Sequence, residues 1–127
     1  MRALLDTSFF VAHESGRPLG SADYVTETEI SVVTVSELTL GVLTASDATR
    51  SDRVATLANV EATWEPLPID AAVARQFAHT ASALKREGRR IGLLDVMIAA
   101  TAIVHDLPVV TQDSDFSHIP DLDVILV

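Results

Sequence analysis

The sequence predicts an α/β domain in which helices flank a mostly parallel central sheet. The chain has 127 residues, which is the usual size of one domain. Short apolar runs alternate along it with longer segments of helical periodicity, and this alternation is typical of parallel strands joined by helices. Hydrophobic residues make up 48% and charged residues 21% of the chain, which excludes wholesale disorder. We therefore expect one hydrophobic core of ordinary size.

The first strand and the first helix are expected close to the beginning of the chain. Residues 3–5 are a short apolar run that ends at Asp6, and such a run is typical of a buried strand. The segment 7–14 has the pattern of a short helix. Gly16 and Pro18 follow it and are expected to end it.

The next segments predict a strand, two helices and an edge strand. β-branched residues favour a second strand over 29–33, which passes directly into a helix over 34–43. A further helix is expected over 47–60. Residues 63–69 are extended in character, and their two prolines restrict them to a short third strand at an edge of the sheet.

The second half of the chain predicts two long helices and two strands. Asp70 is expected to cap a helix that runs to Glu87 and ends at Gly88. Residues 93–105 are apolar almost all round, which indicates a buried helix. Strands are expected over 107–110 and 123–127.

Five acidic residues follow these predicted strands. Asp6 closes the first strand, and Asp113 and Asp115 lie just past the strand 107–110. Glu37 lies about one turn into the helix after the second strand, and Asp95 lies in the first turn of the apolar helix. Because the carboxyl ends of parallel strands meet at one edge of a sheet, we expect these carboxylates to gather at that edge.

A cluster of carboxylates needs a cation to be stable. Asp95 shares its helix face with core residues, and no Lys or Arg lies at helical spacing on that face. Two carboxylates about 4 Å apart repel each other by about 4 kcal/mol at an effective dielectric near 20. Carboxylate ligands select hard ions such as Mg²⁺ or Mn²⁺, and such an ion can activate water for phosphodiester cleavage.

Four segments of the chain together match a known family. They are residues 4–8 (LLDTS), 36–42 (SELTLGV), 94–102 (LDVMIAATA) and 109–116 (VVTQDSDF). In this order and spacing they resemble the PIN-domain ribonucleases, and most closely the VapC toxins of type II toxin–antitoxin pairs. The resemblance implies a single PIN-like domain over residues 1–127, built as an α/β/α sandwich.

The resemblance also implies an activity and the residues responsible for it. The family cleaves RNA at a phosphodiester in a metal-dependent reaction, usually leaving a 5′-phosphate. Asp6, Glu37, Asp95 and Asp113 match the acidic quartet that binds Mg²⁺, with Mn²⁺ as an alternative, and that positions the attacking water. Asp115 matches a second, less constant acid, and either Asp113 or Asp115 is the direct ligand.

Hydroxyl residues beside the acids match further positions of the family. Thr7 or Ser8, together with Thr111, match residues that orient the first and last carboxylates or contact phosphate. The family often has Asn where this chain has Ser8, and Asn or Asp at position 113.

The resemblance also implies protein partners. VapC-like toxins usually form homodimers and are silenced by a VapB-like antitoxin, whose tail lies across the acidic site and often inserts an arginine. The formal net charge of −9 and the isoelectric point of about 4.6 suit a basic segment of such a partner. We expect no membrane partner, because no apolar run reaches the ~18 residues of a spanning helix. The absence of cysteine fits the cytoplasm and excludes disulfide scaffolds, zinc ribbons and Cys nucleophiles.

Each acid also has a purely structural interpretation. Asp6 and Asp95 fit helix N-caps, and Thr34 with Glu37 has the spacing of a capping box. The two acids of the segment 111–116 fit a turn. These interpretations account for single residues but not for the gathering of all of them at one sheet edge.

The basic and aromatic residues leave alternatives open. Lys85, Arg86, Arg89 and Arg90 fit either a solvated helix end or a track for RNA phosphates leading to the carboxylates. Trp64 fits the core or an interface better than a platform for stacking bases. The four histidines lack the spacing of a zinc helix motif, and His105 fits a helix end.

Other function classes fit the sequence less well. An inactive PIN-like module that binds RNA or a protein partner would be expected to have lost an acid, and no quartet position has. A receiver-like signalling domain needs a lysine after a late strand, whereas the one lysine, Lys85, lies in a helix. A phosphatase of the Asp-x-Asp class needs a second aspartate at position 8, which is serine.

Overall fold

The computed structural model describes residues 1–127 and contains a four-stranded parallel sheet in the order β2-β1-β3-β4. Its strands are β1 (Arg2–Leu5), β2 (Glu27–Ile30), β3 (Val109–Thr111) and β4 (Val124–Leu126). Its helices are α1 (Thr7–Ser15), α2 (Val32–Leu43), α3 (Asp47–Thr63), α4 (Ala71–Arg86) and α5 (Leu93–Val104), followed by the short 3-10 helix η1 (Ser114–His118). The predicted α/β fold with a parallel sheet is confirmed.

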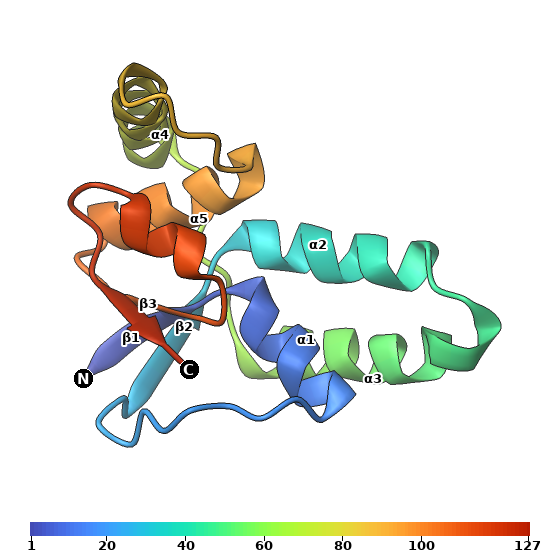
Figure 1. The fold of residues 1–127 in the computed structure, drawn as a ribbon. Helices are drawn as coiled ribbons and strands as arrows, with labels where there is room; N and C mark the ends of the chain where they lie inside the picture. The colour runs from blue at the N-terminus through green and yellow to red at the C-terminus, as the bar shows by residue number, and fades with distance from the viewer.

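Two hydrophobic cores lie on opposite faces of the sheet. Successive strand residues point to opposite faces, so Leu4 packs with α4 and α5 while Leu5 packs with α1, α2 and α3. Val109 and Val110 of β3 divide in the same way. Strands buried on both faces need a continuous apolar sequence, as these have. The result is the expected α/β/α sandwich, with α2 and α3 extending side by side from one end of it (Figure 1).

Two predicted strand segments differ from the structure. Residues 63–69 form no strand, and Leu67 alone makes a bridge, to Ser31. Both neighbours of Leu67 are prolines, which have no N–H to extend a ladder. β2 ends at Ile30 because Ser31 caps the next helix, its Oγ accepting the Val33 N–H at 3.0 Å. Residues 32 and 33 are therefore helical, not strand.

The helix ends follow the predicted signals. Asp70 caps α4 by accepting the Val73 N–H at 3.0 Å, and Gly88 after its end has a φ of 68°. His105 caps the carboxyl end of α5, as its place in the sequence indicates. None of the helices combines the length and the hydropathy that a membrane-spanning segment requires.

Candidate metal centre

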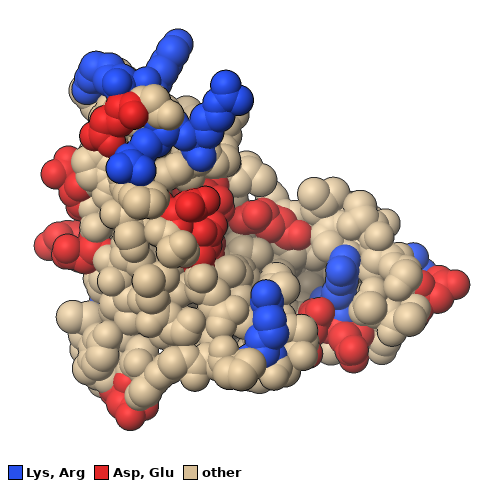
Figure 2. Space-filling view, viewed as in Figure 1, with Lys and Arg blue, Asp and Glu red and all other residues tan.

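The sheet brings the carboxyl ends of β1 and β3 together, and the acids lie there. Asp6 directly follows β1, and Asp113 lies two residues after β3. Glu37 lies on α2, which begins where β2 ends, and Asp95 lies in the first turn of α5. Figure 2 shows acidic side chains gathered in the middle of one face of the molecule, beneath a basic group at its top. The predicted gathering at one sheet edge is what the structure contains.

Asp6 is held through one of its two carboxylate oxygens. The residue is only 3% exposed. Its Oδ2 accepts hydrogen bonds from Ser8 Oγ at 2.7 Å and from Thr111 Oγ1 at 2.8 Å, and it caps α1 through the Ser8 N–H at 3.4 Å. Its Oδ1 accepts no hydrogen bond within the protein. The N-cap interpretation is therefore correct, and it leaves one oxygen free for another ligand.

The two hydroxyls on Asp6 are themselves fixed by backbone N–H groups. Gln112 N–H donates to Ser8 Oγ at 3.0 Å, and Asp113 N–H donates to Thr111 Oγ1 at 2.9 Å. Each hydroxyl thus accepts from the chain after β3 and donates to the carboxylate after β1. This arrangement ties the ends of the two central strands together and sets the direction of the Asp6 side chain.

Glu37 is half-buried and is also held through one oxygen. Its Oε1 accepts from Thr7 Oγ1 at 2.8 Å, and its Oε2 accepts nothing. Burial raises the pKa of Glu37, the Thr7 hydrogen bond lowers it, and the charge of Asp6 raises it further. The capping-box interpretation of Thr34 and Glu37 is wrong, because Ser31 is the N-cap and Glu37 is bonded to a different helix.

Asp95 is the only acid of the five that is shielded from solvent and yet has no partner for its carboxylate. Neither of its oxygens accepts a hydrogen bond, so it does not cap α5 in the way the sequence allows. Burial raises its pKa to about 6, and the negative charges of Asp6, Glu37, Asp113 and Asp115 contribute in that order. The other four carboxylates are therefore close enough for their charges to disfavour ionisation of Asp95.

Asp113 and Asp115 differ in their surroundings. Asp113 is partly buried, and its Oδ1 accepts the Asp115 N–H at 2.9 Å, which confirms the turn interpretation for this residue. Its Oδ2 accepts nothing. Asp115 is exposed, and its carboxylate accepts no hydrogen bond. Asp113 thus resembles Asp6 and Glu37, each with one oxygen fixed and one free.

The donor set fits a hard divalent cation. None of the five acids forms an ion pair; the three ion pairs in the chain are Arg2–Glu29, Arg50–Asp47 and Arg89–Glu87. No three acidic or histidine side chains lie close enough to coordinate one ion together in this conformation. Mg²⁺ keeps several of its waters, and water-mediated contacts allow wider spacing between carboxylates. The free oxygens and the missing counter-charge therefore match such an ion.

The basic residues before α5 lie close to this edge. Lys85, Arg86, Arg89 and Arg90 are all exposed, and Arg89 Nε lies 3.4 Å from Glu87 Oε2. Lysine and arginine side chains gather over the end of α4 and the segment after it, directly above the acidic group (Figure 2). A hollow of about 500 Å³ among them extends to Val96, the neighbour of Asp95.

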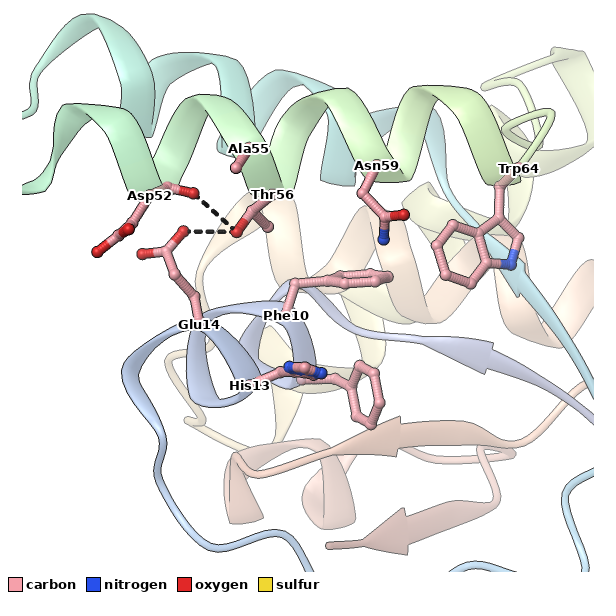
Figure 3. Close-up of a pocket in the computed structure, with 9 residues that line it drawn as sticks. Phe10, His13, Glu14, Asp52, Ala55, Thr56, Asn59 and Trp64 are labelled. Atoms are coloured by element: carbon pink, nitrogen blue, oxygen red, sulfur yellow. Dashed lines mark hydrogen bonds between the residues drawn. The ribbon is translucent and has the colours of Figure 1, made fainter.

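Another cavity lies between α1 and α3, away from the acids. It measures about 580 Å³ and has an aromatic wall that includes Phe10 and Trp64, with ring centroids 5.3 Å apart (Figure 3). None of the five acids lines it. Trp64 Nε1 donates to the Thr28 carbonyl at 3.1 Å and its ring packs on the core, which confirms the structural interpretation of this residue.

Two residues near the acids were not predicted from the sequence to lie at this site. Thr34 is fully buried, and its hydroxyl lies 2.9 Å from that of Thr7. Arg53 of α3 lines a small cavity of about 190 Å³ together with Thr7 and Glu37. The spacing of Thr34 and Glu37 places both on one face of α2, which is a local signal, whereas the approach of Arg53 depends on how α2 and α3 pack.

Known proteins resemble this chain over nearly its whole length. The family model described as PIN domain matches residues 3–122. Ribonuclease VapC5 of Mycobacterium tuberculosis is 45% identical over 115 residues, which are 90% of this chain and 84% of the relative. Ribonuclease VapC4 of the same organism is 41% identical over 128 residues, which are 99% of this chain and 97% of the relative.

Solved structures share the fold. The crystal structure of VapBC-5 from Mycobacterium tuberculosis, a member of the VapBC family of toxin–antitoxin systems, matches with a TM-score of 0.84 and 36% identity, covering 99% of this chain and 98% of that one. The crystal structure of FitAcB from Neisseria gonorrhoeae matches with a TM-score of 0.75 and 29% identity, covering 98% and 96%.

Proposed function

Because the chain belongs to the PIN domain family, and within it to the VapC ribonucleases, we propose that it is a metal-dependent endoribonuclease that acts as a toxin. The observation that supports the metal site is the group of five carboxylates without a basic partner. Asp6, Glu37 and Asp113 each have one oxygen fixed and one free, and Asp95 has two free. These four residues would hold Mg²⁺ or Mn²⁺, with the exposed Asp115 as an outer acid.

Such an ion supplies two things to the hydrolysis of a phosphodiester: it lowers the pKa of a water and it offsets the charge that develops on the phosphate. The residues of this chain supply position. Ser8 and Thr111 fix Asp6 through one oxygen, and Thr7 fixes Glu37 through one oxygen, so that the other oxygen of each carboxylate remains available to a ligand. Prior fixing of ligands reduces the reorganisation that cation binding requires.

Arg89 and Arg90 are proposed to guide RNA to the carboxylates. They are exposed in the basic group beside the acidic edge, and Arg90 forms no ion pair. The net charge of −9 opposes binding of RNA by bulk attraction. We therefore expect the protein to select its RNA by shape and by loop sequence, with a local basic track providing phosphate contacts.

The partners proposed for the chain are a VapB-like antitoxin and a second copy of itself. The solved relative at 36% identity is a VapBC toxin–antitoxin system. Neighbouring leucines are exposed in pairs, Leu40 with Leu43 on α2 and Leu93 with Leu94 on α5, and we propose that a partner covers them. Sedimentation of the purified protein, alone and with its antitoxin, measures both associations.

The activity is tested by incubating purified protein with total RNA in Mg²⁺, in Mn²⁺ and with excess chelator. We expect fragments with either metal, none with chelator, and none with Asp95→Asn. Asp123→Asn is the matched control, because Asp123 is an exposed acid outside the group, and it should cleave like wild type. Cleavage that persists with chelator and in Asp95→Asn contradicts the proposal; a folded wild type that binds RNA without cutting any supports the inactive module instead.

A further inference from the structure

The hydroxyl of Thr34 is bonded to another helix and not within its own. Thr39, Thr63 and Thr101 each donate their hydroxyl to the carbonyl four residues earlier in the chain. Thr34 does not, and its only hydrogen-bonding neighbour is Thr7 Oγ1, at 2.9 Å. The carbonyl four residues before it, that of Ile30, already accepts the Leu67 N–H at 2.8 Å. The hydroxyl of Thr34 is therefore directed toward α1.

The hydrogen bonds around Thr7 have one possible direction. Thr7 has a single hydroxyl hydrogen, and it donates this hydrogen to Glu37 Oε1 at 2.8 Å. An ionised carboxylate can only accept. Thr7 Oγ1 must therefore accept from Thr34, and the order of donation is Thr34 to Thr7 to Glu37. Because Thr34 is fully buried, no water competes for this position.

We infer that Thr34 is a positioning residue for Glu37, acting through the Thr7 hydroxyl. By donating to Thr7, it removes the rotational freedom of that hydroxyl and keeps its hydrogen on Glu37 Oε1. The other oxygen of Glu37 then remains free in a defined direction. The inference deepens the proposed function, since a fixed Glu37 matters most where that carboxylate holds a cation.

The first test uses the metal-free protein. The ¹³C resonance of the Glu37 carboxyl is compared among wild type, Thr7→Val, Thr34→Val and Thr34→Ser at one pH. We expect Thr34→Val to move this resonance in the same direction as Thr7→Val, and Thr34→Ser to restore it, because serine keeps the hydroxyl. A resonance that moves in Thr7→Val but not in Thr34→Val overturns the inference.

The second test measures Mn²⁺ binding by calorimetry. Thr34→Val should weaken binding by about three- to tenfold, less than the loss expected for a direct partner of a ligand. In a Thr7→Val background the same change should not weaken Mn²⁺ binding further, because the hydrogen bonds that connect Thr34 to Glu37 through Thr7 are already lost. Thr80→Val is the matched control, since Thr80 is also a buried helical threonine (3% exposed) but lies on α4 with Gln76 as its partner.

The outcomes distinguish a failure of the inference about Thr34 from a failure of the proposed cation site. Two results would indicate a general packing effect and overturn the inference. In the first, Thr34→Val and Thr80→Val weaken Mn²⁺ binding equally. In the second, Thr34→Val weakens Mn²⁺ binding as much in the Thr7→Val background as in wild type. Wild type that binds no Mn²⁺ contradicts the cation site instead, and the metal-free resonances then decide whether Thr34 orients Glu37.

Discussion

Asp95 and Asp6 belong to the same acidic group, but their surroundings give them opposite effects on stability. Asp95 has no hydrogen bond and faces four negative charges, so its ionised form is disfavoured in the folded protein. Asp6 accepts three hydrogen bonds and caps a helix, so its carboxylate supports the fold. Substitutions at these two positions therefore distinguish a residue retained for a ligand from one that also holds the structure.

Replacing Asp95 by Asn is expected to stabilise the metal-free protein above pH 6. In the folded protein Asp95 keeps its proton up to a pKa of about 6, whereas the unfolded value is 3.8. Between pH 3.8 and about 6 the folded protein therefore binds a proton at Asp95 that the unfolded chain does not, and the contribution of Asp95 to stability is lost as the pH rises through this range. The shift corresponds to about 3 kcal/mol, which solvent screening of a half-buried group reduces to about 1 kcal/mol.

Urea denaturation of both proteins at pH 4.5 and pH 7.5, with chelator present, measures this difference. The stability difference between Asp95→Asn and wild type should be larger at the higher pH. A variant that is less stable than wild type at pH 7.5 would show that Asp95 has a stabilising partner, against the structure.

Asp6→Ala is expected to destabilise the fold by about 2 kcal/mol, because it removes an N-cap and leaves two hydroxyls without their acceptor. Asp6→Asn keeps an acceptor oxygen and should retain most of the stability while losing cleavage. Urea midpoints and a cleavage assay on both variants separate the two roles. Full activity in Asp6→Asn would remove Asp6 from the proposed metal ligands.

At the scale of elements, strand direction is what made the acidic edge predictable. Short apolar runs ending in Asp6 and before Asp113 indicated parallel strands, and parallel strands end at the same edge. The contacts that fix the acids were not predictable in the same way. Thr7 meets Thr34 and Glu37 from 27 and 30 residues away, and such pairs depend on how helices pack.

The errors at this scale have local causes. The prediction of a capping box was wrong because both Ser31 and Thr34 fit the N-cap position, and Ser31 is the N-cap in the structure. The prediction of an edge strand over 63–69 was wrong because the prolines on both sides of Leu67 limit this segment to one bridge. In each case the sequence allowed two local solutions, and the neighbouring element determined which one formed.

The segment joining α4 to α5 is expected to contact RNA phosphates. Reversing Arg89 and Arg90 to Glu should weaken RNA binding about tenfold at low salt and lower the slope of log affinity against log salt by about 1 per lost phosphate contact. The melting temperature should not change, since both side chains are exposed. Binding is measured in an Asp95→Asn background, so that the RNA stays intact.

The matched control reverses Arg50 and Arg75, which changes the net charge equally at exposed positions outside the basic group. A general charge effect would weaken RNA binding as much in the control as in the test variant. That result would leave Arg89 and Arg90 as a solvated helix end.

The whole molecule places its acidic group where the two halves of the sandwich meet. Asp6 follows the central strand β1, Glu37 comes from the layer of α1, α2 and α3, and Asp95 comes from the layer of α4 and α5. A cation held by these residues joins both layers to the sheet. Without a metal ion the carboxylates repel one another, and a bound cation would remove this repulsion. Cation binding should therefore raise the free energy of unfolding of the whole protein.

The most direct test of this account is a calorimetric titration of Mn²⁺ into metal-free protein at pH 7.5, with wild type, Asp95→Asn and the control Asp123→Asn. The account predicts saturable binding by wild type and by the control, and binding weaker by about 10- to 100-fold in Asp95→Asn. No saturable binding by folded wild type, or equal affinity in Asp95→Asn, would contradict the claim that the five carboxylates form a cation site.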